Sequence, residues 1–158
     1  MLYRGMRLDT HLLLEGKILP RGDQIEVVPR YDGTWCYDGT FTYGYSEDNA
    51  VRAHHIENGK WGGCFVSTTD SWEVAKFFAT SDEEENRYPG VIYHIDPALF
   101  AVHGVVSRKF DDPLYPEEFE VSIRAEDGGP IPAEVIVRIE EVDFPSAYMR
   151  RRGAVITR

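Results

Sequence analysis

The stretch CFVSTTDSWE, residues 64–73, predicts how the middle of the chain folds. Its first part, 64–69, combines apolar and β-branched side chains, which is typical of a buried strand. Asp70 and Glu73 then form a capping-box pattern, and apolar residues follow at helical spacing. Those apolar residues are Trp72, Ala75, Phe78 and Ala79. The stretch therefore predicts a strand that leads directly into a helix.

The chain before this stretch predicts a short strand, a short helix and a long irregular segment. Residues 1–4 are typical of a strand, and a brief helix is expected over 9–15. Residues 20–49 are irregular but rich in aromatic side chains, which gather between 31 and 45. Long loops inside small domains usually have a function or move, so this one is of interest. A further helix is expected over 47–58.

The chain after this stretch predicts several strands. They are expected over residues 90–95, 99–106, 118–124 and 134–142. In the last, Val135, Val137 and Ile139 alternate with more polar residues and should share one face. Helices early in a chain and strands later are typical of an α+β fold with mainly antiparallel sheets.

Composition indicates one globular domain. The chain has 158 residues, of which 42% are hydrophobic and 13% aromatic, and no Gly-, Ser- or Pro-rich linker divides it. We expect one domain over 1–145, followed by a basic tail over 146–158 that contains three consecutive arginines and is loosely held.

Charge and targeting signals narrow the possible partners. The net charge of −10 repels phosphate backbones and argues against a nucleic-acid partner. Cys36 and Cys64 form no paired motif, which suggests reduced thiols, although a disulfide between them is an open alternative. Cys64 is expected to be a small core residue. No signal peptide precedes Leu2, and no apolar run is long enough to span a membrane. The chain therefore acts in the cell that makes it, or something else delivers it.

Two glutamates in the segment YPEEFEVSI, residues 115–123, are the first candidates for chemistry. On an extended chain, Glu118 and Glu120 would point to the same side. Paired carboxylates repel each other unless a cation or a cationic intermediate compensates. Cleavage of an N-glycosidic bond produces such an intermediate, an oxocarbenium ion. A solvated acidic strand end is, however, the commoner meaning of such a pair.

Two other segments carry polar groups next to apolar strands. Ser67, Thr68 and Thr69 place three hydroxyls at a strand end, where they either cap the following helix or orient a catalytic carboxylate. Arg4 lies between an apolar strand start and Gly5, and it is either a surface ion-pair residue or a contact for NAD phosphate or for the scaffold.

Taken in order, these segments resemble the arginine-specific mono-ADP-ribosyltransferase toxins, the family of the catalytic A subunits of cholera toxin and the heat-labile enterotoxins. Matching stretches run from residue 1 to about 140 and are weakest over 25–60. They are LYRGMR (2–7), GKILPRG (16–22), GGCFVSTTDS (62–71), GVIYHIDPALF (90–100), YPEEFEVSI (115–123) and GGPIPAEVI (128–136). The resemblance implies two packed, mainly antiparallel sheets with flanking helices and an NAD cleft between them.

The resemblance also implies a role for each matching residue. Glu120 would stabilise the oxocarbenium ion and hold the ribose 2′-hydroxyl, and Ser67 would orient Glu120. Glu118 would orient the acceptor guanidinium and help to deprotonate it. The NAD-binding residues would be Arg4, Gly5, Ser67, Thr68 and Glu120, with Gly5 near the nicotinamide amide. The acceptor would be recognised by Tyr115, Glu118 and Phe119, and NAD would be a co-substrate with no metal required.

Three departures from that family matter. Thr69 stands where the toxins have a second serine, which keeps the hydroxyl. The tail that links the toxins to their receptor-binding partner is missing, so delivery would need a separate module, and an immunity protein is a further expected partner. The activation-loop histidine has no clear match, although His54 or His55 could fill its place. We expect a delivered effector that acts in the cytosol of a target cell.

Several alternatives stay open. The acceptor could be water, giving an NAD glycohydrolase, or a nucleotide base, although relatives that modify bases often carry Gln in place of the first Glu. The chain could instead be a catalytically inactive binding domain that keeps the fold and uses the aromatic loop over 31–45 to bind a partner. No GxGxxG motif supports a Rossmann site, and no Cys or His cluster has metal-ligand spacing.

Overall fold

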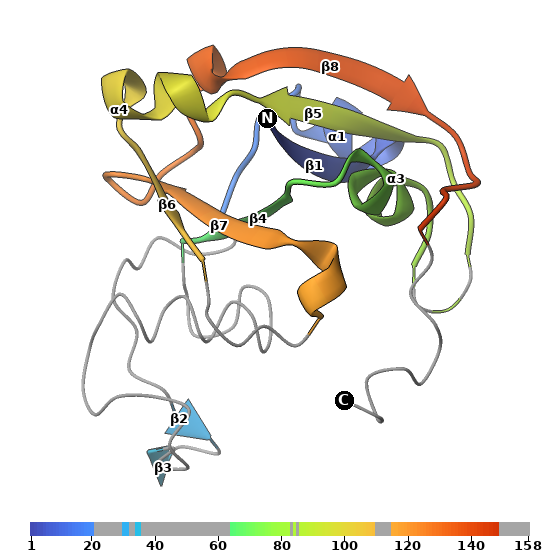
Figure 1. Ribbon diagram of the computed structural model, residues 1–158, viewed down its shortest axis with the longest axis horizontal. Coiled ribbons are helices and arrows are strands. Elements are labelled where there is room, and N and C mark those ends of the chain that lie inside the picture. The colour runs from blue at the N-terminus through green and yellow to red at the C-terminus, as the bar shows by residue number, and fades with distance from the viewer. Residues whose placement is uncertain are drawn as a thin grey trace.

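The described part of the chain contains one six-stranded antiparallel sheet. The computed structural model describes residues 1–20, 64–82, 84, 86–109 and 115–148, together with the backbone of 30–31 and 34–35. The strands are β1 (Leu2–Arg7), β4 (Val66–Thr69), β5 (Gly90–Ile95), β6 (Val105–Arg108), β7 (Glu120–Ala125) and β8 (Ile136–Val142). Their order in the sheet is β6-β7-β4-β1-β5-β8, and every neighbouring pair is antiparallel (Figure 1). A separate two-stranded ribbon pairs β2 (Arg30–Tyr31) with β3 (Thr34–Trp35).

Short helices connect the strands. They are α1 (Leu8–Leu13), α3 (Trp72–Thr80), α4 (Phe100–His103) and the 3-10 turns η2 (Pro97–Leu99), η3 (Pro116–Glu118) and η4 (Ala133–Val135). The predicted α+β class with antiparallel strands is therefore confirmed.

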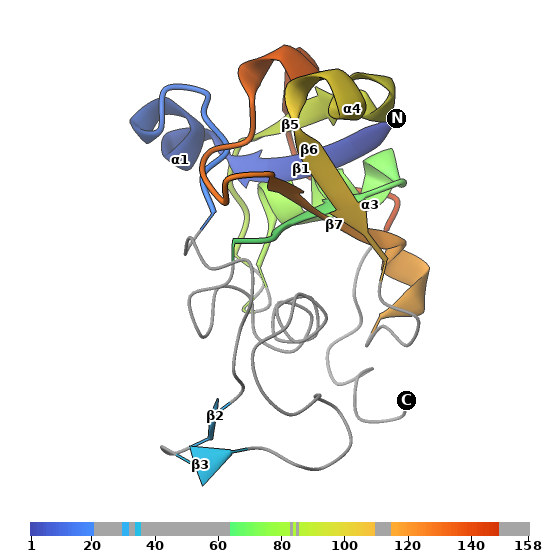
Figure 2. The same ribbon diagram turned by 90° about the vertical axis from the view of Figure 1, so that its left-hand side faces the viewer.

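The expected pair of packed sheets takes a different form. Among the described residues, β1 and β4 pair at a single position, Tyr3 opposite Thr69, and this pair joins the two halves of the sheet. Figure 2 shows β6 crossing in front of β1, and side chains from both halves of the sheet meet in one buried cluster. One sheet thus encloses the core where two separate sheets were expected.

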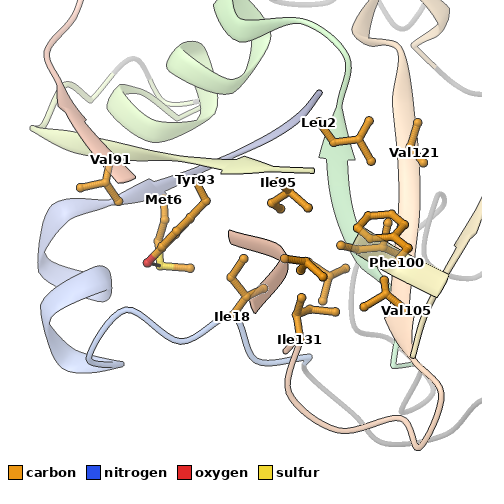
Figure 3. Close-up of a cluster of buried hydrophobic side chains, with 13 residues drawn as sticks. Leu2, Met6, Ile18, Val91, Tyr93, Ile95, Phe100, Val105, Val121 and Ile131 are labelled. Atoms are coloured by element: carbon orange, nitrogen blue, oxygen red, sulfur yellow. Dashed lines mark hydrogen bonds between the residues drawn. The ribbon is translucent and has the colours of Figure 1, made fainter. Parts of the chain in front are cut away.

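Both halves of the sheet contribute to one buried core. Leu2, Met6, Tyr93 and Ile95 come from β1 and β5, and Val121 comes from β7. In Figure 3 the side chains of Ile18 and Ile131 lie between these strands, with Phe100 and Val105 beside Val121. The burial of apolar side chains from both halves stabilises their packing against each other.

Helix α3 covers the other face of β1 and β5. Its Ala75 and Ala79 are fully buried, and they lie over Gly5 and Gly90. A Cβ atom on Gly5 would come 2.0 Å from the Ala75 carbonyl oxygen, and one on Gly90 would come 2.2 Å from the Ala79 carbonyl oxygen. The helix backbone approaches the sheet this closely because small residues face each other across the interface.

The predicted strand-to-helix transition over 64–73 is present, but its cap differs. Ser71, not Asp70, is the N-cap of α3, and its hydroxyl accepts a hydrogen bond from the Val74 N–H at 3.3 Å. Glu73 does not complete a capping box, because its carboxylate binds residues near the C-terminus. Phe78 is half-exposed, whereas its neighbour Phe77 is buried.

The predicted strand over 99–106 is wrong in its first half. Asp96 caps a helical turn by accepting a hydrogen bond from the Ala98 N–H, with Pro97 in the first position. Gly104, at φ +68°, ends α4 in the left-handed region, and β6 begins only after it.

The alternation predicted in 134–142 does not produce a buried face. Val135 is fully buried in η4, but Val137 and Ile139 are largely exposed on β8. Because β8 is an edge strand of the sheet, its alternate residues need not pack into the core.

Several predictions lie outside the described residues. They include most of the segment 20–49, the helix over 47–58, and residues 149–158 of the expected tail. The division at residue 145 stays a prediction, although residues 146–148 pack against α3.

Candidate active site

Ser67 and Glu120 lie in direct contact on adjacent strands. β4 and β7 pair with Ser67 opposite Ser122 and Thr69 opposite Glu120, which puts Ser67 and Glu120 in diagonal positions on one face. The Ser67 hydroxyl donates a hydrogen bond of 2.7 Å to Glu120 Oε2. A carboxylate held in this way is oriented by the strand register and does not depend on a flexible loop.

Arg4 reaches this pair from β1. Its Nη1 donates a hydrogen bond of 2.8 Å to the backbone carbonyl of Ser67. Arg4 lies opposite Tyr93 of β5, whose hydroxyl is 2.6 Å from His11 Nδ1. Burial raises the pKa of Tyr93, and the positive charge of Arg4 partly opposes this rise. The structure therefore brings three of the predicted residues together from β1, β4 and β7.

The two threonines that follow Ser67 bond to the backbone around Glu120. The Thr68 hydroxyl donates to the Val121 carbonyl at 2.7 Å, and the Thr69 hydroxyl donates to the Glu118 carbonyl at 2.5 Å. Thr69 also accepts from the Ser71 N–H at 3.0 Å, which links the site to the start of α3. Contact of Thr68 with NAD stays a prediction.

Glu118 enters the site in a way that the sequence did not predict. The strand begins at Glu120, because Pro116–Glu118 form a 3-10 turn and Phe119 is left-handed with φ +48°. The expectation that Glu118 and Glu120 alternate along one strand is therefore wrong. Glu118 is 5% exposed, and its Oε2 accepts a hydrogen bond of 2.6 Å from the Tyr148 hydroxyl.

The two aromatic residues predicted to recognise the acceptor flank Glu118. Phe119 is 59% exposed, whereas Tyr115 is partly buried at the start of the 3-10 turn. Residues 110–114, which complete this loop, lie outside the described residues, as do His54 and His55.

Gly5 has a structural role that the sequence alone did not reveal. It lies under α3, where no side chain fits, and it pairs with Ile92 of β5. Contact between its backbone and nicotinamide stays a prediction.

Sequence reasoning missed Tyr148 altogether. It lies 30 residues from Glu118 in sequence, in the segment expected to be a loose tail. An aromatic residue shortly after Pro145 was the only local signal, and no motif connects it to Glu118.

A second polar cluster lies on the α3 side of β5 and β8. Glu140 Oε1 accepts hydrogen bonds from Trp72 Nε1 at 2.5 Å and lies 2.6 Å from His94 Nε2. Burial acts to raise the pKa of Glu140, but the hydrogen bonds from Trp72 and His94 and the charges of His94 and Arg138 lower it overall. This cluster ties α3 to the sheet edge.

The described residues contain neither a metal-binding cluster nor a helix suited to a membrane. No group of three or more His, Cys, Asp or Glu side chains within them could hold a metal ion, and Cys64 is fully buried. None of the helices they contain is long and apolar enough to cross a membrane.

Comparison with known proteins assigns this chain to a protein family. No curated protein matches the chain significantly. The family model NarE matches residues 1–123, a range that runs from β1 into β7 and includes Arg4, Ser67, Glu118 and Glu120. Because the match covers most of the chain, this protein belongs to the NarE family.

Proposed function

We propose that this protein is an NAD-dependent mono-ADP-ribosyltransferase that modifies an arginine side chain of a target protein. The observation that carries the proposal is the contact of Ser67 with Glu120, with Arg4 bound to the carbonyl of the same serine. These residues come from three strands far apart in sequence. They are the residues to which the resemblance to the arginine-specific toxins gives roles in NAD binding and catalysis. Membership of the NarE family supports the same class of activity.

The first half of the proposed reaction needs a fixed negative charge. The bond between nicotinamide and ribose C1′ breaks, nicotinamide leaves with the bonding electron pair, and the ribose becomes an oxocarbenium ion. Glu120 stabilises this cation, since its carboxylate is already oriented by Ser67 and by the register of β4 and β7. Ser67 in turn is held by Arg4 through its carbonyl.

The second half needs a proton acceptor beside the incoming nitrogen. A guanidine nitrogen of the acceptor attacks C1′, and the proton that it loses passes to Glu118 as the new bond forms, because the pKa of a free guanidinium is far too high for the proton to leave beforehand. The exposed ring of Phe119 and the nearby Tyr115 offer surfaces on which a guanidinium stacks.

Two alternatives change the acceptor, and one removes the activity. Water as acceptor gives an NAD glycohydrolase, and a nucleotide base as acceptor is disfavoured by the net charge of −10. A silent binding domain would keep the fold without cleaving NAD, but the Ser67–Glu120 contact has no need to exist in such a domain. Delivery into a target cell is part of our proposal and is independent of the chemistry.

The test is to measure nicotinamide release and arginine labelling in parallel. Glu120→Gln should abolish both, with a loss on the order of 10²–10³ or more, because charge stabilisation is common to both reactions. Glu118→Gln should abolish labelling while much of the nicotinamide release survives. The double variant should be no worse than Glu120→Gln, since both groups act on one pathway.

The exposed Glu134→Gln provides the matched control and should change neither activity. Near-normal NAD cleavage by Glu120→Gln would disprove the catalytic assignment and favour the silent domain. Equal loss of both activities in Glu118→Gln would disprove the division of labour but not the family of reactions.

A further inference from the structure

The segment that follows β8 is fastened to α3. The Ser146 hydroxyl donates to the Glu73 carbonyl at 2.6 Å, and the Ala147 N–H donates to Glu73 Oε2 at 2.7 Å. Figure 1 shows this red segment turning down from β8 toward α3. The Phe144 ring lies under the Arg87 guanidinium, 4.2 Å from its Cζ atom. Residues 144–148 are therefore held at several points, and we refer to them as the C-terminal strap.

The strap ends with Tyr148 held in a defined position. The Tyr148 ring packs edge-on against Phe77 of α3, with ring centroids 5.5 Å apart. Its N–H donates to the Ser146 hydroxyl oxygen at 3.1 Å, which fixes the backbone next to the ring. Both the ring and the backbone of Tyr148 are thus restrained before its hydroxyl makes any contact.

The hydroxyl of Tyr148 meets the carboxylate of Glu118. The distance of 2.6 Å is in the range of a charge-assisted O–H···O⁻ hydrogen bond. The backbone of the same region is held from β4, where Thr69 bonds to the Glu118 carbonyl and the Asp70 N–H bonds to the Phe119 carbonyl. Glu118 is therefore fixed at its backbone by one element and at its carboxylate by another.

We infer that Tyr148 is a positioning residue, which holds the Glu118 carboxylate in the orientation that receives the acceptor guanidinium. The inference rests on the proposed function, in which Glu118 serves the acceptor. A carboxylate has about four acceptor positions, so the bond from Tyr148 does not by itself prevent a guanidinium from binding. The NarE match ends at residue 123, so Tyr148 lies beyond the matched range.

The decisive variant is Tyr148→Phe, which keeps the ring against Phe77 and removes only the hydroxyl. With agmatine or a peptide arginine as acceptor, kcat for transfer should fall on the order of tenfold or more. Nicotinamide release to water and KM for NAD should stay close to wild type, since neither uses Glu118. Tyr88→Phe removes only the hydroxyl of a ring that stacks on Arg7, and it should change none of these values.

A second variant loosens the strap without touching Glu118. Ser146→Ala removes the bond to the Glu73 carbonyl and should lower the ratio of transfer to hydrolysis in the same direction as Tyr148→Phe. Equal loss of transfer and hydrolysis in Tyr148→Phe would make Tyr148 merely structural and overturn the inference. Faster transfer would overturn it too, because Tyr148 would then block the acceptor site.

The contact can also be tested without any activity. A double-mutant cycle of Tyr148→Phe with Glu118→Ala, which leaves no acceptor for the hydroxyl, should give a non-additive change in the midpoint of denaturant unfolding. If wild type releases no nicotinamide, the proposed function fails while the cycle still reports the contact. If wild type is active and the cycle is additive, the inference about Tyr148 fails on its own.

Discussion

Replacement of Gly5 by Ala tests how α3 is fitted to the sheet. The added methyl group would lie 2.0 Å from the Ala75 carbonyl oxygen and 2.8 Å from the Ala79 N–H nitrogen. Both atoms belong to the helix backbone, so no side-chain rotation relieves the contact. Because ordinary contact begins at 3.4 Å, α3 must shift by 3.4 − 2.0 = 1.4 Å or the strand must distort.

The size of the effect follows from that displacement. Overpacking typically costs about 1–3 kcal/mol, and a backbone clash of this depth belongs at the upper end. For a chain of this size, each kcal/mol lowers the melting temperature by roughly 2–4 °C. Gly5→Ala should therefore lower the melting temperature on the order of 6–12 °C.

The assay is thermal unfolding followed by circular dichroism, with Gly129→Ala as the matched control. A methyl group at Gly129 would meet only a flexible carboxylate, Asp127 Oδ1 at 3.1 Å, so its effect should be small. If Gly5→Ala unfolds within a degree or two of wild type, the close fit of α3 on β1 is wrong. If stability is kept but NAD affinity is lost, Gly5 serves the nucleotide and not the packing.

Three further predictions concern the site and its surroundings. Ser67→Ala removes a hydrogen bond to a carboxylate and should lower nicotinamide release about 10- to 150-fold. The control Ser107→Ala, on β6, should have no effect, and equal rates in both variants would refute the orienting role of Ser67. Phe119→Ala should lower transfer to protein arginine more than NAD hydrolysis, since the ring is exposed, and parallel losses would instead indicate packing. Glu140 has a lowered pKa in the folded state, so its charge stabilises the fold above its ordinary pKa of 4.5, and this stabilisation is lost as pH falls through the lowered value. Glu140→Gln should therefore destabilise the protein most above pH ~5 and progressively less in acid, and a difference in melting temperature that does not vary with pH would contradict this.

Local patterns in the sequence predicted the elements that local chemistry determines. The strand at Val66–Thr69 and the helix after it follow from β-branched residues and helical spacing. The strand predicted over 99–106 failed because Gly104 and the Asp96 cap outweigh the apolar character of the segment. The side of β8 that is buried could not be read from alternation, because burial depends on which elements cover an edge strand.

The candidate site likewise contains residues that the sequence predicted and residues whose positions depend on tertiary packing. Ser67 and Glu120 were predicted from the family pattern, and the register of β4 and β7 supplies the physical reason for their contact. The relation of Glu118 to Glu120 was wrong, because a left-handed Phe119 separates the 3-10 turn from the strand. Tyr148 could not be predicted, since its position depends on the docking of the strap on α3.

The single paired position between β1 and β4 gives Arg4 a structural role beside the NAD contact proposed for it. If the register at Tyr3 and Thr69 continued, Gly5 would lie opposite Ser67, and the two backbones would complete the ladder. The strands separate instead, and the Ser67 carbonyl accepts a hydrogen bond from the Arg4 guanidinium. The Arg4 side chain thus links β1 to the strand that carries Ser67, beyond the point where backbone pairing ends. The join between the two halves of the sheet and the support for Ser67 therefore lie next to each other on β1, at Tyr3 and Arg4.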